Sequence, residues 1–381
     1  MDKKLRIIVL MGGSSNEKET SLDSGRNVVY KLSSQKYEAL PVFVDKNNEL
    51  YPLTTRLLVH NATSEIEFGL DRSTRINWHD LPTMADFIFI ALHGGVGENG
   101  SVQGALEMLG MPYNGPGVMA SALCMDKYKT NSLLKKYGFS VPENILITKR
   151  EWNQDKANCL ESIKKNLHYP LIVKPHNDGC SVFVARIEND RDLESHIDQL
   201  LTKTQSHALI EECITGIELT VGVVGNEFPK ALPPSQSIAQ RGVLSMEEKF
   251  LPGAGENQTP APLPSNILRF VQDTLVRVYM ALGCVGYSRI DCFYQNASQS
   301  PTGSDRIVIL ECNTLPALTP ATCLFHQAAE LDIMPSEFLD LVISLGLQEY
   351  QRKGGCQFTK DNVKNFELSP LLLQFQKQLS M

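Results

Sequence analysis

Two apolar stretches in the C-terminal half of the chain carry charged or amide side chains at every second position. Arg289 and Asp291 stand in the first stretch, and Glu311 and Asn313 in the second. Side chains of a β-strand alternate between its faces, so each pair is expected on one face. Buried carboxylates need compensation, which Mg²⁺ with phosphate oxygens would supply because hard cations prefer oxygen ligands. The alternative is a salt bridge between Arg289 and one of the acids.

Two lysines stand where a phosphate group would fit. Lys174 stands at the end of the apolar run 171–174, and Pro175 and a glycine-containing turn follow it. Lys127 follows Asp126 at the start of a predicted helix. An ammonium group beside the backbone N–H groups of a turn suits phosphate binding. A solvated position is the alternative for both lysines.

The first apolar stretch ends in Gly12-Gly13, which would let the backbone approach a ligand closely. Glu17 is then placed to offer a carboxylate to a substrate ammonium. Glu19 is better explained as an acid that complements the dipole of a first helical turn, and this role is open to Glu17 as well. His93 is either a proton carrier or anion contact, or a loop residue without such a role.

The composition is that of a globular protein that binds neither nucleic acid nor membranes. The chain has 381 residues, 42% hydrophobic and 21% charged, with a net charge of -7; this length predicts two or three domains. The negative charge argues against a polyanion partner. The apolar run Leu5–Met11 is too short for a signal peptide or a membrane span.

The nine cysteines are scattered singly, without a Cys-x-x-Cys pair, which favours a reduced, cytoplasmic protein. The eight histidines show no zinc-binding spacing. Any metal is therefore expected to be held by oxygen ligands.

Apolar periodicity predicts an open α/β beginning followed by two α+β sections. The first section has strands at 5–11 and 87–92 and a helix at 22–32, and the loop 93–100 is too rich in glycine to be helical. The polar, Gly- and Pro-rich stretch 238–264 is longer than an ordinary connection and is expected to be a lid. Residues 371–373 suit a short docking helix. The other expected elements are helices at 127–137, 157–167, 190–201 and 265–282 and strands at 171–174, 182–186, 208–211, 218–224, 285–294 and 307–312.

Six ordered segments within residues 5–350 together resemble the D-alanine:D-alanine ligase family of the ATP-grasp superfamily. They are LMGGSSNEKETSLDSG (10–25), ALHGGVGENGSVQGALEMLGMPYNGPGVMASALCMDKYKT (91–130), LIVKPHNDGCSV (171–182), LIEECITGIELTV (209–221), GYSRIDCF (286–293) and LECNTLPALTPAT (310–322). The resemblance implies a three-domain ligase of mixed α/β and α+β class, in which two α+β domains clamp ATP. The expected divisions are a substrate domain with an open parallel sheet (1–125), a central ATP-grasp subdomain (126–216), a catalytic domain with the lid (217–352) and a tail of unknown role (353–381).

The resemblance also implies roles for individual residues. Phosphates would be held by Lys127, Lys174 and Lys249, the adenine edge by Glu211 and the ribose by Glu218. Two Mg²⁺ ions, for which Mn²⁺ would substitute, would be held by Asp291, Glu311 and Asn313, with Glu311 bridging. The remaining implied site residues are Glu17, Arg289, Ala317, Cys180 and Ser181 in catalysis and His93, Thr322 and Phe250 in substrate binding.

The implied reaction has two steps. The first D-alanine would bind with its ammonium group on Glu17 and its carboxylate near His93. This carboxylate then attacks the γ-phosphate and forms an acyl phosphate. The amine of the second D-alanine, held through its carboxylate by Thr322, then attacks the acyl carbon. Arg289 and the backbone N–H of Ala317 would stabilise the oxyanion, and closure of the lid would keep water out.

Several positions depart from the family pattern around the substrate. The usual Gly-Ser-Ser-Val-Gly turn is replaced by Gly-Cys-Ser-Val-Phe at residues 179–183, and Phe250 stands where the lid usually has a tyrosine. A Glu-Ser-Tyr network thus becomes Glu17, Cys180 and Phe250, with weaker hydrogen bonding because a thiol is a poor donor and phenylalanine has none. Ala317 stands for a customary glycine, which matters if that position needs a positive φ.

Three functions follow as alternatives. The first is a D-alanine:D-alanine ligase for peptidoglycan precursors and hence for cell-wall biogenesis. The second is a ligase of the same family that takes D-lactate or another small D-acid as second substrate, because Phe at the lid position is associated with such enzymes. The third is a catalytically inactive ATP-binding paralogue. The implied partners are D-alanine and ATP, and the family resemblance implies a homodimer.

Overall fold

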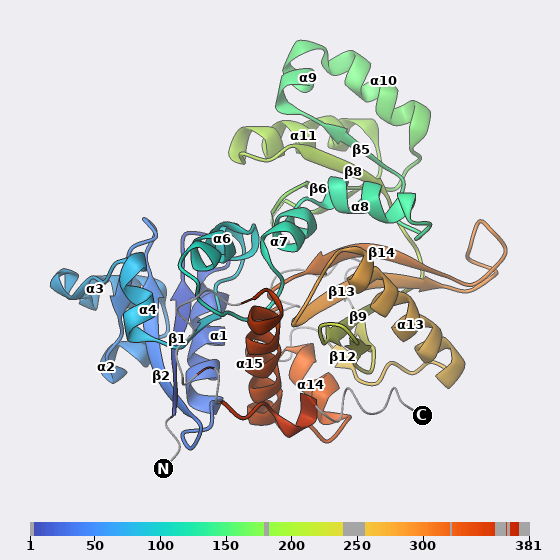
Figure 1. Cartoon of the computed structure of the whole chain (residues 1–381). Coiled ribbons are helices and arrows are strands. Elements are labelled where there is room, and N and C mark those ends of the chain that lie inside the picture. The colour runs from blue at the N-terminus through green and yellow to red at the C-terminus, as the bar shows by residue number, and fades with distance from the viewer. Residues whose placement is uncertain are drawn as a thin grey trace.

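The computed structural model describes residues 4–178, 183–238, 256–320, 322–354, 363 and 366–372. Three β-sheets, each with its own helices, form three units that meet around α7, α8 and α15 (Figure 1). The greater part of the expected lid and the turn 179–182 lie outside the described residues. Within them, none of the helices is both long enough and apolar enough to cross a bilayer.

The N-terminal unit contains a four-stranded sheet in the order β3-β2-β1-β4. β1 pairs in parallel with β2 and β4, while β3 runs antiparallel at the edge. The predicted strands at 5–11 and 87–92 and the helix at 22–32 are confirmed within a few residues. The strands are β1 (Leu5–Gly12), β2 (Tyr37–Val44), β3 (Leu50–Pro52) and β4 (Phe87–Ile90), and the helices are α1 (Lys18–Lys31), α2 (Thr55–Leu58), α3 (Thr63–Gly69), α4 (Leu81–Met84) and α6 (Ser101–Met108).

The expectation that the loop 93–100 contains no helix is wrong. α5 (Gly95–Glu98) forms one helical turn within it. The turn is possible because Gly94 adopts φ 63°, a conformation that glycine takes without cost, and because the Glu98 carboxylate accepts a hydrogen bond from the Gly94 N–H at 2.6 Å. The glycines thus permit a short helix, which the hydrogen bond from the Gly94 N–H to the Glu98 side chain stabilises.

The central unit is an antiparallel sheet in the order β5-β8-β6-β7, covered by three helices. The apolar residues of α11 recur at Leu193, Ile197, Leu200 and Leu201, the spacing of a single buried helix face. The side chain of Asn189 caps this helix by accepting the Asp192 N–H. The elements are β5 (Asn144–Ile147), α9 (Lys149–Gln154), α10 (Lys156–Asn166), β6 (Leu171–Pro175), β7 (Ala185–Ile187), α11 (Asp190–Lys203) and β8 (Ala208–Glu212).

The third unit is an antiparallel sheet in the order β12-β11-β9-β13-β14, with β10 paired to β9. Its apolar core lies toward α13, and the helices α7 and α8, which precede the central unit in sequence, also contribute to that core. The elements are α7 (Val118–Met125), α8 (Lys127–Lys136), β9 (Ile217–Val224), β10 (Lys230–Ala231), β11 (Ser235–Ile238), β12 (Glu256–Gln258), α13 (Ser265–Ala281), β13 (Tyr287–Gln295) and β14 (Arg306–Asn313).

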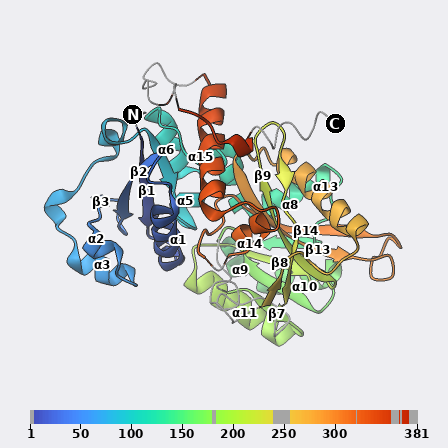
Figure 2. The ribbon, with the colours of Figure 1, turned by 90° about the horizontal axis from the view of Figure 1, so that it is seen from below.

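The two helices α14 (Cys323–Ala329) and α15 (Pro335–Arg352) complete the core of the N-terminal unit. One buried cluster joins Ile8 and Phe87 of its sheet to Phe338 and Leu341 of α15. α15 therefore lies between the N-terminal sheet and the sheet of β13 and β14 (Figures 1 and 2). Part of the expected tail packs here too: Leu372 is buried in this cluster, and the N–H of the nearby Ser369 donates to a side chain of α15.

Two helical glycines provide a matched test of this packing. A Cβ on Gly346 of α15 would lie 2.4 Å from the Tyr113 carbonyl oxygen, whereas one on Gly104 of α6 would meet its nearest atom at 3.7 Å. We expect Gly346→Ala to lower the free energy of unfolding by about 1–3 kcal/mol through overpacking. Gly104→Ala should raise it by up to about 1 kcal/mol through helix propensity. Urea unfolding measures both, and equal effects would contradict the close approach of α15.

Candidate functional site

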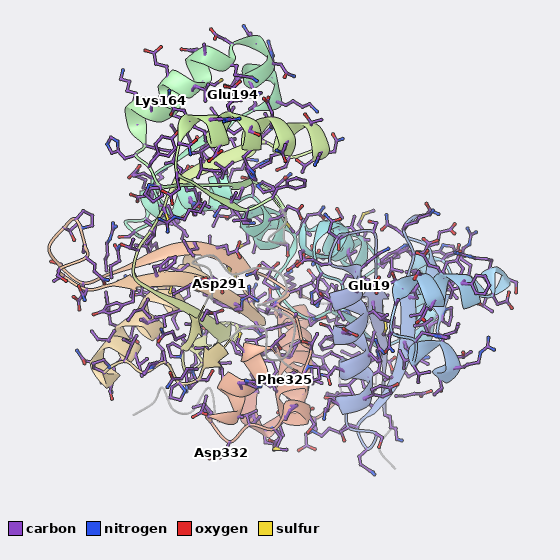
Figure 3. The ribbon with its side chains drawn as sticks, turned by 180° about the vertical axis from the view of Figure 1, so that it is seen from behind. Glu19, Lys164, Glu194, Asp291, Phe325 and Asp332 are labelled. Carbon is purple, nitrogen blue, oxygen red and sulfur yellow. The ribbon has the colours of Figure 1, made fainter. Side chains whose placement is uncertain are left out.

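The face of the third sheet opposite α13 carries the four polar side chains predicted to share it. β13 and β14 pair so that Arg289 faces Asn313 and Asp291 faces Glu311. The intervening residues, such as Cys312, turn into the apolar core. The predicted alternation is confirmed, and Figure 3 labels Asp291 on this sheet.

Arg289 and Asp291 form a two-pronged ion pair. The guanidinium donates from Nε to Oδ1 at 3.0 Å and from Nη2 to Oδ2 at 2.8 Å. Thr220 Oγ1 donates to the same carboxylate at 2.5 Å. Burial works against the charge of Arg289, but Asp291 outweighs it and raises the pKa of the guanidinium. The salt bridge considered from the sequence is present, and it holds a permanent positive charge on this face.

Lys127 links three parts of the site. The carboxylate of Asp126 caps α8, which fixes Lys127 in the first turn. Its Nζ donates to the Asp178 carbonyl at 2.6 Å and lies 3.4 Å from Glu311 Oε2. Only about a tenth of the side chain is exposed. Lys127 is therefore not the solvated lysine that the sequence also allowed.

Lys174 pairs with Glu211 on the neighbouring strand. Lys174 Nζ lies 2.6 Å from Glu211 Oε2, and both side chains are buried. Asn131 Nδ2 donates to the other carboxylate oxygen at 3.2 Å. Sequence reasoning missed Asn131, although it stands one helical turn after Lys127 and therefore on the same face of α8. Glu218, expected near the ribose, lies half-buried on β9 opposite Phe293 of β13.

His93 lies between α1 and the segment that follows β14. Its Nε2 is 2.7 Å from Ser24 Oγ, and its Nδ1 is 3.0 Å from the Leu315 carbonyl oxygen. Burial, opposed by the hydrogen bond to the Leu315 backbone and assisted by the charge of Arg289, lowers the pKa of His93 to about 4. His93 is thus a neutral imidazole at physiological pH, which favours a positioning or hydrogen-bonding role over that of a cation.

Glu17 lies against the His93 loop. A Cβ on Gly94 would be 2.7 Å from Glu17 Oε2, so a larger residue there would displace the carboxylate, and the φ of 63° at this position also favours glycine. Oε2 is buried and, among the described residues, has no hydrogen-bond partner. Burial and, after it, the nearby charge of Glu98 raise the pKa of Glu17 to about 8 against the opposing charge of Lys127. A buried carboxylate oxygen without a donor is suited to receive an ammonium group. Glu19, by contrast, accepts hydrogen bonds from the backbone N–H and hydroxyl of Thr63.

Glu98 is a site residue that sequence reasoning missed. Its carboxylate accepts from the Gly94 N–H at 2.6 Å and from the Leu315 N–H at 3.3 Å, and burial raises its pKa. It therefore ties the His93 loop to the segment after β14. An acid within the sequence Gly-Val-Gly-Glu was the available signal, because a carboxylate in a glycine-rich loop often binds backbone N–H groups.

The raised pKa of Glu17 predicts the pH dependence of substrate capture. Below about pH 8 the carboxyl is largely protonated and pairs weakly with an ammonium, so kcat/KM for a substrate whose ammonium binds there should rise from pH 6 toward 8. Glu17→Gln should flatten this rise and lower kcat/KM by about 10- to 100-fold. Glu19→Gln is the control and should keep the rise. A profile that is flat in the unmodified protein would contradict the assignment.

The segment after β14 places Ala317 and Thr322 beside the charged face. Ala317 is buried and is not among the described residues with positive φ, so its replacement of the family's glycine carries no backbone strain. The Thr322 hydroxyl donates to the Thr319 carbonyl at 2.9 Å at the start of α14. Burial raises the pKa of the thiol of the next residue, Cys323, and the nearby charge of Arg289 opposes this shift.

Four predicted site residues lie outside the described residues: Cys180, Ser181, Lys249 and Phe250. The adjoining Phe183, which replaces a customary glycine, adopts φ 60°. A left-handed conformation at a non-glycine residue costs on the order of 1 kcal/mol or more. The carbonyl oxygen of Phe183 lies 3.0 Å from His196 Nε2, and a hydrogen bond that it accepts from this nitrogen helps to hold the conformation.

The donor set on β13 and β14 suits a hard cation. Asp291, Glu311 and Asn313 offer only oxygen ligands, and all three lie on one partly buried face. Mg²⁺ is commonly bound by one or two carboxylates together with substrate phosphates. The nearby Lys127 would contact those phosphates. The residues present therefore fit a magnesium–nucleotide site.

Comparison with known proteins gives consistent matches across the chain. Residues 6–116 match the family model described as D-ala D-ala ligase N-terminus, and residues 133–344 match D-ala D-ala ligase C-terminus. A D-alanine--D-alanine ligase of Desulforudis audaxviator is 36% identical over 88% of this chain and 96% of its own length. That of Halalkalibacterium halodurans is 32% identical over 91% of this chain and its entire length.

Solved structures of related ligases share the fold. The D-Ala:D-Ser ligase VanG of Enterococcus faecalis superposes with a TM-score of 0.77 at 26% identity, covering 90% of this chain and 100% of its own. The Bacillus anthracis D-alanine--D-alanine ligase complexed with ATP gives a TM-score of 0.68 at 28% identity, covering 92% and 100%. The expected ATP-grasp fold is thereby confirmed.

Proposed function

The chain belongs to the D-alanine–D-alanine ligase family and is an ATP-dependent enzyme that joins two D-alanine molecules, and we propose that the residues described above carry out its two steps. The observation that supports this division of roles is the convergence of three groups. The Arg289–Asp291 face and Lys127 belong to the third unit, whereas the Glu17 loop belongs to the N-terminal unit. Lys127 Nζ lies 3.4 Å from Glu311 Oε2, and the charges of both residues act on the Glu17 carboxyl. The product, D-alanyl-D-alanine, is a peptidoglycan precursor.

In the first step Glu17 holds the ammonium of the first D-alanine, and His93 orients its carboxylate. Lys127 and Lys174 hold the phosphates of ATP, together with Lys249. Because Lys174 pairs with Glu211 in this structure, ATP binding exchanges that ion pair for contacts with the nucleotide. The bound carboxylate then attacks the γ-phosphate, the bond between the β- and γ-phosphates breaks, and ADP is released as the acyl phosphate forms; positioning supplies much of the rate.

In the second step the amine of the second D-alanine attacks the acyl carbon and displaces phosphate. Arg289, held in place by Asp291, and the backbone N–H of Ala317 donate to the developing oxyanion. Thr322 holds the second carboxylate by exchanging its bond to Thr319. Glu218 would bind the ribose, and the segment 238–264 would close over the site.

Magnesium bound to Asp291, Glu311 and Asn313 would neutralise charge on the transferring phosphate. We propose that these three side chains would hold two such ions, and that Mn²⁺ would be a functional substitute. The oxygen-only donor set supports this choice over a softer metal.

We also propose that the enzyme is cytoplasmic and homodimeric, with the units divided near residues 125, 216 and 352. The described cysteines are all free, which fits a reducing compartment. The dimer rests on the family resemblance, and sedimentation equilibrium would test it.

The test is release of ADP with ATP and Mg²⁺, offering D-alanine alone and then D-alanine with D-lactate or D-serine, across about pH 6 to 9. We expect D-alanyl-D-alanine, identified by mass, from D-alanine alone. If the main product is instead a D-lactate ester, which is favoured at low pH where the competing amine is protonated, the second substrate is D-lactate and not D-alanine. ATP binding without substrate-dependent ADP release would contradict the enzymatic assignment.

A further inference from the structure

Three cysteines that are far apart in the sequence meet in the core behind the charged face. Cys124 comes from the last turn of α7, Cys284 from the connection between α13 and β13, and Cys312 from β14. Their Sγ atoms all lie within 4.8 Å of one another, and Cys284 and Cys312 are 3.9 Å apart. All three side chains are buried. They form the one group of three or more metal-ligating side chains found among the described residues.

These spacings match three sulfurs around one ion. A metal–sulfur bond of about 2.3 Å places three thiolates about 4 Å apart in a trigonal arrangement. The 3.9 Å separation already meets this value, and closing the longest separation requires shifts of well under 1 Å by side chains. A disulfide would join two sulfurs at about 2.0 Å and leave the third out.

The surroundings of the three cysteines also favour a bound ion. Among the described residues the fully buried Ser288 hydroxyl makes no hydrogen bond within the usual distance and angle limits, and the thiols of Cys284 and Cys312 are the groups beside it with which it interacts. A buried hydroxyl without a partner is uncommon because it costs about 1–3 kcal/mol. Metal-bound thiolates accept hydrogen bonds more strongly than thiols do, so this hydroxyl would gain a partner as an outer-shell donor.

We propose that Cys124, Cys284 and Cys312 form a three-thiolate site for a soft, thiophilic cation. Thiolates select soft ions, whereas the oxygen ligands on the opposite face of the same sheet select hard ones. The thiol protons leave to solvent as the ion binds. The ion would join α7, the α13–β13 connection and β14 at one point, independently of the ligase reaction.

Cadmium is a suitable probe, because its bonds to thiolates give an ultraviolet charge-transfer band that carboxylate ligands do not give. The reduced protein, with Cys180 and Cys356 changed to alanine, is titrated with Cd²⁺ under excess Mg²⁺. We expect one equivalent to saturate the band and to raise the thermal unfolding midpoint. If this protein, in which Cys124, Cys284 and Cys312 are all intact, shows no thiolate band, the proposal is overturned.

Variants then locate the site. Cys312→Ala should weaken Cd²⁺ binding by at least about 100-fold, since even outer-shell changes cost 10- to 100-fold. Cys292→Ala is the matched control: Cys292 is buried in the same core on the adjacent strand but is not one of the three, and its loss should leave the band unchanged. Cys124→Ala and Cys284→Ala repeat the test if Cys312→Ala does not fold. A band that survives all three substitutions would place the ion elsewhere and overturn the proposal.

Discussion

Arg289→Lys should lower kcat about 100- to 1,000-fold while ATP affinity changes only a few-fold. Lysine keeps the charge but cannot make the two parallel bonds by which Arg289 is held to Asp291. An oxyanion donor that is displaced contributes little, and loss of one such donor typically costs this much. Single-turnover ADP release and equilibrium ATP binding, measured on the same preparation, separate the two effects.

The control for Arg289→Lys is Arg306→Lys. Arg306 stands at the other end of β14, where its Nε donates to Gln295. The Arg306→Lys substitution should leave kcat unchanged. Equal losses in both variants, or a loss of ATP affinity that parallels kcat at position 289, would show that Arg289 supports the sheet or the nucleotide and not the oxyanion.

Asp291→Asn should have the largest combined effect on activity and stability. The amide keeps the shape but loses the charge that both Arg289 and a magnesium ion require, so we expect kcat to fall about 1,000-fold. The free energy of unfolding should fall by about 3 kcal/mol, because the largely buried Arg289 loses the carboxylate with which it pairs directly. Urea unfolding without Mg²⁺ isolates the second effect.

Asp273→Asn is the control for Asp291→Asn, because Asp273 is an exposed acid on α13. It should change neither kcat nor the unfolding midpoint. If Asp291→Asn unfolds more easily but keeps its turnover and its Mg²⁺ dependence, Asp291 supports Arg289 without holding a metal.

Local patterns predicted the site residues that lie within regular strands. The alternation at Arg289, Asp291, Glu311 and Asn313 required only that both stretches be strands, which their apolar residues indicated. The resemblance to the ligase family then identified the lysines, whose sequence context alone suited a solvated position equally well. Lys127 and Lys174 are instead held by Glu311 and Glu211.

Contacts between distant segments could not be predicted in this way. Glu98 joins Gly94 to Leu315, and the three clustered cysteines come from three separate segments. No spacing along the chain could therefore predict either arrangement. The helix within the glycine-rich loop was missed for a related reason. Glycine content indicates backbone freedom, whereas the turn depends on a hydrogen bond that the Gly94 N–H donates to one particular carboxylate, that of Glu98.

The contribution of α15 to the N-terminal core has a consequence for how the protein is made. The first sheet is complete once residue 90 has been synthesised, but Phe338 and Leu341, which cover part of it, follow some 250 residues later. At about 5–20 residues per second, a nascent chain would expose that apolar surface on the ribosome for tens of seconds at most. Chaperones are expected to shield it during this interval. Premature termination before α15 should therefore yield aggregation-prone fragments and not a stable substrate domain.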